Sequence, residues 1–214
     1  MNLNALILFS RLLILAEAAA AIAGLITWSK WRGTYLKWVP LYLALIVCLE
    51  LSERLLRNFG QVAVASLILK VSIVTEMLFI HCFFYKTLNK KIIIAGACVY
   101  LLGFLLENFF IQDELYYFQS LSYTIGNLFI LVYLLMFFME LVKSEKILVF
   151  KKLTVFWISL GMLVFYLGTF PFYGLYNELS KDLDLFVPLA WISTSLNYSM
   201  YLLFTIAFIW GKPQ

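Results

Sequence analysis

The sequence predicts an all-α, polytopic membrane protein, folded as a bundle of seven transmembrane helices. Hydrophobic residues make up 64% of its 214 residues and charged residues only 13%, which leaves too little polar surface for a soluble domain of this length. The apolar segments are about 20 residues long or longer, as spanning helices require, and they lack the two-residue alternation of membrane β-strands. Both observations favour spanning helices and argue against an outer-membrane barrel.

Seven apolar segments follow one another with short polar connections between them. No connection is long enough to contain a second domain, so we expect one transmembrane domain over residues 1–214. Its helices are predicted at about 5–28, 38–56, 62–85, 92–110, 117–141, 153–175 and 185–210.

The first segment, 5–28, has small residues at every fourth position. Ala16, Ala20 and Gly24 would lie on one face of a helix. Small residues at this spacing let two membrane helices approach closely. We therefore expect another helix to pack against this face.

The second segment, 38–56, ends in four charged residues, Glu50, Glu53, Arg54 and Arg57. Their spacing of i, i+3, i+4 and i+7 puts all four on one helix face, with each carboxylate four residues before a guanidinium. The pattern predicts two ion pairs within the helix, Glu50 with Arg54 and Glu53 with Arg57. Charged groups inside a bilayer normally face a protein interior, a water-filled cavity or the headgroups.

The third and fourth segments also contain charged residues. Lys70 and Glu76 interrupt 62–85, and Glu107 lies near the end of 92–110. Each would need a partner or access to water within the bundle.

The last three segments are mostly apolar. Asn127 is a polar residue within 117–141, Pro171 interrupts 153–175, and Asn197 lies within 185–210. The two prolines at 171 and 188 are expected bending points.

The distribution of basic residues predicts the orientation. The connections after the first, third and fifth helices, together with the tail, contain eleven of the sixteen lysine and arginine residues. By the positive-inside rule these connections are cytoplasmic, so the N-terminus is outside and the C-terminus is cytoplasmic. The connections Gln112–Glu114 and Asn177–Asp184 are acidic and belong to the outer side.

Depth in the membrane follows from position, at about 1.5 Å per helical residue. The expected polar cluster comprises Arg11, Glu17, Glu50, Glu53, Arg54, Lys70, Glu76, Glu107, Asn127 and Asn197. A level near the middle of the membrane contains Glu17, Glu50, Glu76 and Asn197. We expect an outward-opening polar pocket walled by Arg11, Glu50, Glu53, Arg54, Lys70 and Glu107.

Three structural interpretations compete with a binding site. Glu17 and Glu76 can be protonated in the membrane and merely hydrogen-bonded. Glu53, Arg54 and Arg57 can extend to the outer interface while they pair with one another. Alternatively, Glu50 pairs with a cation from another helix, Lys70 or Arg11, and the pair holds the helices in register.

The residue inventory excludes several membrane enzymes and cofactor proteins. A zinc hydrolase needs several histidine ligands, whereas the single histidine, His81, is expected at the cytoplasmic interface. A retinal protein needs a lysine in its last helix, and none occurs between Lys181 and Lys212. Three cysteines without metal-type spacing are expected to be reduced packing residues. We therefore predict no metal and no cofactor, and the scattered basic residues predict no nucleic-acid binding.

The sequence resembles a group of short bacterial seven-helix membrane proteins that have no settled activity. The resemblance rests on a glutamate-rich second helix, a glutamate in the third, and the aromatic and glycine-rich segment Phe156–Gly168, and it covers most of residues 40–210. It implies a multi-pass protein of the bacterial inner membrane. The topology alone also resembles the SWEET-type sugar transporters and the seven-helix sensor modules that precede bacterial histidine kinases.

These observations predict a protein that binds a small ligand or ion in the outward-facing polar cluster. It would act as a receptor-like or sensory module, with a partner protein in the membrane or cytoplasm to carry the output. The first alternative is a small-solute or proton-coupled transporter. The second is a membrane hydrolase that acts on a lipid with two carboxylates, Glu50 and Glu107, as acid and base. The leading interpretation and the first alternative are not enzymes, whereas the second alternative is.

Overall fold

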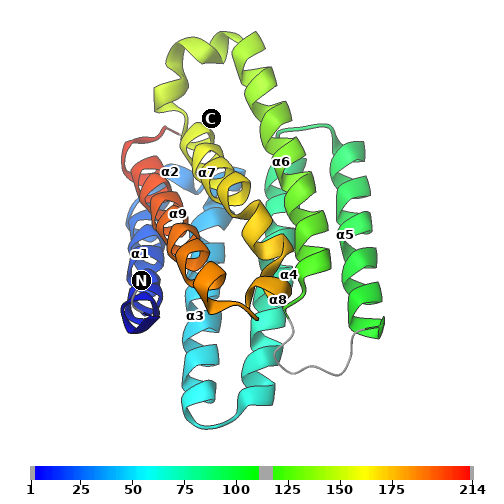
Figure 1. The fold of residues 1–214 in the computed structure, drawn as a ribbon. Helices are drawn as coiled ribbons and strands as arrows, with labels where there is room; N and C mark the ends of the chain where they lie inside the picture. Colours follow the sequence, from blue (N-terminus) through cyan, green and yellow to red (C-terminus); the bar gives the residue numbers. More distant parts are fainter. Residues whose placement is uncertain (1–2, 111–117, 213–214) are drawn as a thin grey trace.

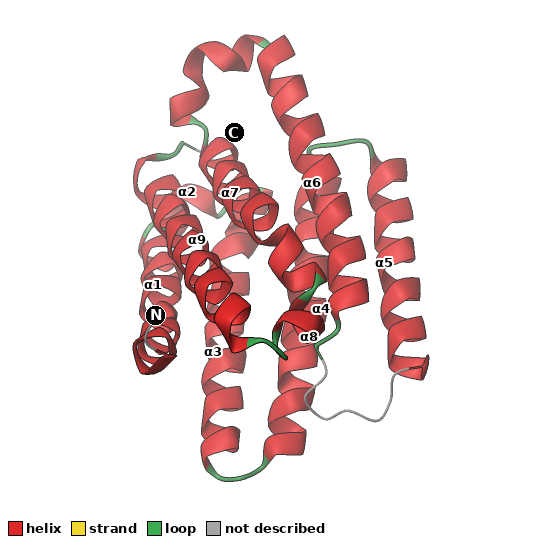
Figure 2. Ribbon diagram, in the orientation of Figure 1, coloured by secondary structure: helices red, strands yellow, loops and turns green. Residues whose placement is uncertain are grey.

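A computed structural model describes residues 3–110 and 118–212 of the chain, and almost all of this part is helical (Figures 1 and 2). It contains no strand in these ranges, only an isolated bridge between Leu153 and Lys212. The long helices are α1 (Leu3–Ile26), α3 (Trp38–Asn58), α4 (Val62–Tyr85), α5 (Lys90–Phe110), α6 (Ser120–Lys143), α7 (Thr154–Gly174) and α9 (Leu183–Trp210). Shorter pieces connect them: α2 (Trp28–Trp31), η1 (Tyr35–Lys37), η2 (Glu145–Lys152) and α8 (Tyr176–Leu179). The predicted acidic turn Gln112–Glu114 lies outside the described residues.

Six of the long helices are long and apolar enough to cross a membrane: α1, α4, α5, α6, α7 and α9. Large apolar side chains such as Leu15, Leu102 and Leu135 are exposed on their outer faces. Contiguous apolar surface of this kind is typical of proteins surrounded by lipid. The prediction of an all-α multi-pass membrane protein is therefore confirmed. The exception among the long helices is α3, which contains the charged residues Glu50 to Arg57.

Six helices form a closed ring in the order α1, α3, α4, α6, α7 and α9, and α9 returns to α1. The seventh, α5, packs outside this ring against α4 and α6 (Figure 1). A ring of six helices is wide enough to enclose space at its centre.

The small-residue face of α1 is part of this ring. Ala20 and Gly24 are buried, and a Cβ on Gly24 would lie 2.6 Å from Pro40 of α3 and 3.1 Å from Phe208 of α9. The predicted close packing on this face is therefore confirmed, and it joins α1 to both of its neighbours.

The two ends of the bundle differ in charge. Most basic connections, η2 among them, lie at the end where the described chain finishes (Figure 1). Lys30 Nζ donates a 3.0 Å hydrogen bond to the carbonyl of Ile209 at this end. At the other end lie the start of α1, α8 and the turn between α3 and α4, where Gly60 has a φ of +76° that favours glycine.

The cysteines differ in part from the prediction. Cys48, Cys82 and Cys98 are free, as expected, but they are exposed on the helix surfaces instead of packed in the core.

Candidate functional site

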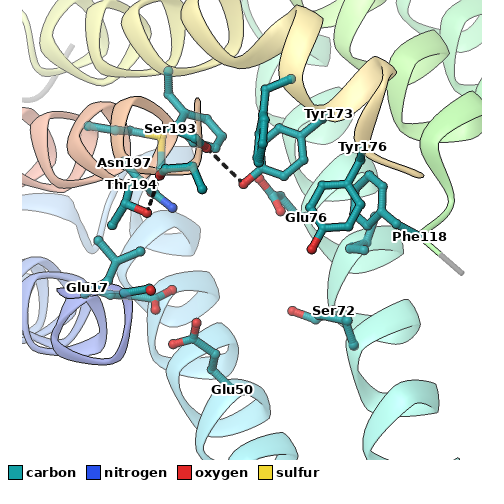
Figure 3. Close-up of a pocket in the computed structure, with 18 of the residues that line it drawn as sticks. Glu17, Glu50, Ser72, Glu76, Phe118, Tyr173, Tyr176, Ser193, Thr194 and Asn197 are labelled. Atoms are coloured by element: carbon teal, nitrogen blue, oxygen red, sulfur yellow. Dashed lines mark hydrogen bonds between the residues drawn. The ribbon is translucent and has the colours of Figure 1, made fainter. Parts of the chain in front are cut away.

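The ring of helices encloses a cavity of about 480 Å³ in its less basic end. All six ring helices contribute residues to its wall. The polar residues of this wall are Ser10, Glu17, Glu50, Ser72, Glu76, Tyr123, Tyr173, Tyr176, Ser193, Thr194, Asn197 and Tyr201 (Figure 3). Volumes of this size suit small molecules.

Three glutamates from three different helices line the cavity. Glu17 comes from α1, Glu50 from α3 and Glu76 from α4. Figure 3 shows the carboxyl groups of Glu17 and Glu50 pointing toward one another, with Glu76 beyond them. Glu17 is only 2% exposed. The cavity therefore gathers three acidic groups that are far apart in the sequence.

Two tyrosines hold two of these carboxyl groups. The hydroxyl of Tyr201 on α9 donates a 3.0 Å hydrogen bond to Glu17 Oε1. The hydroxyl of Tyr166 on α7 donates to Glu76 Oε1. Hydrogen bonds to a carboxyl oxygen orient the group and satisfy part of its hydrogen-bonding capacity. Glu17 and Glu76 thus have defined positions, with further acceptor capacity left for a ligand.

Glu50 is held differently, by an ion pair within its own helix. Its Oε2 lies 3.5 Å from Arg54 Nη2, and Arg54 Nη1 donates a 2.7 Å hydrogen bond to the backbone carbonyl of Arg11. The pair Glu53–Arg57 forms as well, at 2.5 Å. Both predicted pairs within the helix are confirmed. No pair joins Glu50 to Arg11 or Lys70 among the described side chains, so the predicted pairing of Glu50 with a cation of another helix was wrong.

Aromatic rings form one wall of the cavity. Phe118, Tyr123, Tyr173 and Tyr176 lie close together, with the ring centroids of Phe118 and Tyr176 4.8 Å apart and those of Tyr123 and Tyr173 4.8 Å apart. Asn177 positions Phe118, because its side chain bonds to both the backbone N–H and the carbonyl of that residue, at 3.1 and 2.8 Å. Aromatic faces attract cations as well as apolar groups.

The ionisable carboxyl groups of the cavity wall have no basic side chain beside them in the described lining. That lining includes three glutamates and no lysine, arginine or histidine. Asn197 adds an amide oxygen that is buried without a hydrogen-bond partner within residues 3–110 and 118–212. Acceptors next to aromatic faces match a ligand that carries positive charge and N–H donors.

Several residues expected in the pocket wall lie elsewhere. Of the six residues Arg11, Glu50, Glu53, Arg54, Lys70 and Glu107, only Glu50 lines the cavity. Instead, the four residues expected near the middle of the membrane, Glu17, Glu50, Glu76 and Asn197, line it together. The rise per residue predicted a common level for these four residues. The rotation of each helix about its axis decided which polar groups turned inward.

Glu107 is a structural residue. It is 3% exposed, and its two oxygens accept hydrogen bonds from the backbone N–H groups of Leu121 and Ser122, at 3.0 and 2.7 Å. These N–H groups lie in the first turn of α6, where no partner within the helix is available. Glu107 therefore caps α6 from α5.

Asn127 is also buried within the bundle. Its Nδ2 donates a 3.3 Å hydrogen bond to the carbonyl of Tyr166, which joins α6 to α7. It does not line the cavity. Lys70 lines a separate pocket beside the cavity.

His81 is buried, contrary to the expected interfacial position. It is 2% exposed, its Nδ1 lies 2.7 Å from the carbonyl of Met77, and its ring contacts those of Tyr100 and Tyr133. Within the described ranges no group of three or more histidine, cysteine, aspartate or glutamate residues is arranged to hold a metal ion.

Sequence reasoning missed the tyrosines. Tyr166, Tyr173 and Tyr201 lie within long apolar segments, where an aromatic residue is expected to pack against lipid or core. A phenolic hydroxyl deep in such a segment needs a hydrogen-bond partner, and this need could have indicated that these tyrosines face polar groups inside the bundle.

Comparison with protein-family models gave no match, and no curated protein or solved structure matched the chain either.

Proposed function

We propose that this protein is a receptor-like membrane protein that binds a small organic cation in the acidic cavity. The observation that carries the proposal is the convergence of Glu17, Glu50 and Glu76 on one cavity whose described lining has no basic side chain. Carboxyl groups that are crowded in a buried site disfavour one another's ionisation, and a bound cation favours their ionised forms. Charge-assisted hydrogen bonds to the carboxylates would supply much of the binding energy.

The lining of the cavity also suits an amphipathic cation. The aromatic wall of Phe118, Tyr123, Tyr173 and Tyr176 offers apolar surface and ring faces beside the carboxylates. An ammonium group attached to a short apolar chain would satisfy both parts of the wall.

The orientation that we propose puts the cavity on the outer side of a bacterial inner membrane. The cavity lies at the end of the bundle away from most basic connections, and the positive-inside rule assigns those connections to the cytoplasm. This topology needs α3 as a seventh span. In support, α3 packs between α1 and α4 and runs alongside them, and its charges pair within the helix.

The packing of α4 beyond Glu76 supports binding over transport. On α4 the cavity wall extends no further than Glu76, and the next turns are core, with Met77 0% and Ile80 2% exposed. A receptor that signals through a partner protein needs no passage to the cytoplasmic end. The hydrolase alternative loses support because Glu107 caps α6 and does not meet Glu50 at the cavity.

Calorimetric titration of the purified protein in detergent tests the proposal. Hexylamine, which is cationic at neutral pH, should bind, and hexanol, which has the same chain without the charge, should bind at least about tenfold more weakly. Glu17→Gln and Glu76→Gln should each weaken hexylamine binding by about tenfold or more.

Glu140→Gln is the matched control, because Glu140 is exposed and does not line the cavity. It should leave the affinity unchanged. Equal affinity for the amine and the alcohol, or equal effects of all three substitutions, would refute the proposal.

A further inference from the structure

A second pocket, of about 370 Å³, lies beside the acidic cavity. The two share Leu69, Ile73, Phe118 and Tyr176 in their walls. The two pockets are therefore adjacent.

This second pocket is basic. Its described lining includes Arg57 and Lys70 and no acidic residue. Arg57 is paired with Glu53 at 2.5 Å, whereas Lys70 forms no ion pair within the described ranges. The uncompensated positive charge of the pocket thus belongs to Lys70, which is half-buried in an otherwise apolar part of α4.

Gln119 gives the second pocket an unsatisfied polar group. Gln119 is only 3% exposed, and neither Oε1 nor Nε2 of its side chain has a hydrogen-bond partner among the described residues. Leaving a buried amide unpaired costs about 1 to 3 kcal/mol, so most such groups have a partner. A ligand in the pocket would supply one.

Tyr176 adds a neutral donor to the same wall. Burial raises the pKa of its phenol, so the hydroxyl stays protonated at neutral pH and adds no negative charge. Lys70, the Gln119 amide and the Tyr176 hydroxyl together suit a carboxylate or a phosphate.

We propose that the basic pocket binds the anionic end of the ligand whose cationic end occupies the acidic cavity, so that the ligand is a zwitterion. This inference rests on the proposed function and specifies its ligand. Lys70 and Glu76 are six residues apart on α4, which corresponds to about 9 Å along the helix axis. The two charges of the ligand should therefore be several ångströms apart. A free zwitterion and a zwitterionic lipid headgroup share this chemistry.

The first experiment uses soluble probes. Omega-amino acids of increasing chain length are titrated into the detergent-solubilised protein beside the alkylamines and alkanoates of the same length. The best amino acid should bind about tenfold more tightly than its alkylamine, because it gains one charge-assisted interaction. Lys70→Met and Gln119→Leu should remove most of this gain and affect alkylamine binding far less.

Two further variants keep the test independent of folding defects. Lys181→Met makes the same change of charge at an exposed position that lines neither pocket, and it should preserve the gain. Lys70→Arg retains the positive charge and should restore much of the gain that Lys70→Met loses.

The second experiment distinguishes a lipid from a free ligand. The protein is reconstituted in nanodiscs of phosphatidylethanolamine or of phosphatidylglycerol, and the lipids retained after extraction are identified by native mass spectrometry. Selective retention of phosphatidylethanolamine that Lys70→Met abolishes assigns the site to a headgroup. A gain seen only with the soluble amino acids assigns it to a free zwitterion.

The zwitterion inference fails if alkylamines bind as tightly as the amino acids and neither lipid is selected, or if Lys70→Met preserves every gain. In that case hexylamine binding that Glu17→Gln weakens still upholds the proposed function. If no amine binds while alkanoates do, both the proposed function and the zwitterion inference fail.

Discussion

The hydroxyl of Tyr201 donates a 3.0 Å hydrogen bond to Glu17 Oε1 and so joins α9 to α1 at the wall of the acidic cavity. Three residues earlier on α9, the hydroxyl of Tyr198 donates a hydrogen bond of the same length to the backbone carbonyl of Phe9. Both bonds connect the same two helices, but only the first reaches a cavity carboxylate. Substitutions at the two tyrosines can therefore distinguish an effect on the cavity carboxylate from an effect on the packing of α9 against α1.

Tyr201→Phe should weaken hexylamine binding by about three- to tenfold, because the substitution removes the donor that orients the Glu17 carboxyl group. Tyr198→Phe should lower the free energy of unfolding by about 1 kcal/mol, because one hydrogen bond is lost, and it should leave the affinity for hexylamine unchanged. Calorimetric titration measures the affinity, and equilibrium unfolding in mixed micelles measures the stability. Equal loss of affinity in the two variants would mean that the Tyr201 bond acts only through packing.

Glu107→Ala should destabilise the protein by about 1 to 3 kcal/mol, because two N–H groups at the start of α6, that of Ser122 buried, lose their acceptor. Glu107→Gln keeps one acceptor oxygen and should destabilise the protein less than Glu107→Ala does. Equilibrium unfolding in micelles checks both values. Amine affinity should stay unchanged in the Gln variant, and a large loss there would instead place Glu107 in the binding site.

Single cysteines introduced beyond the two ends of α3 test whether this helix crosses the membrane. After Cys48, Cys82 and Cys98 are replaced by serine, a cysteine at exposed Gln61 should react with a membrane-impermeant maleimide added outside intact cells. A cysteine at exposed Gly33 should react only after the membrane is permeabilised. Gel-shift labelling reports both. Labelling of the two positions from the same side would show that α3 does not cross the membrane, and the seven-span topology would be abandoned.

The helices and the pairs within them could be predicted from the sequence, since both depend on residues close along the chain. Glu50–Arg54 and Glu53–Arg57 follow from a spacing of four residues. The close packing of α1 at Gly24 follows from the spacing of small residues. The cap that Glu107 provides could not be predicted, because it depends on where another helix begins.

The sequence by itself determined an all-α membrane protein, and it predicted a common level for Glu17, Glu50, Glu76 and Asn197, because length and rise per residue set depth. Only the tertiary structure decided that these four residues share one cavity, that Tyr166 and Tyr201 hold two of them, and that Lys70 lines a separate pocket. The physical reason is rotation about the helix axis. In a helix that is apolar on every side, the hydrophobic pattern gives little preference for which face turns inward, so packing against the neighbouring helices decides it.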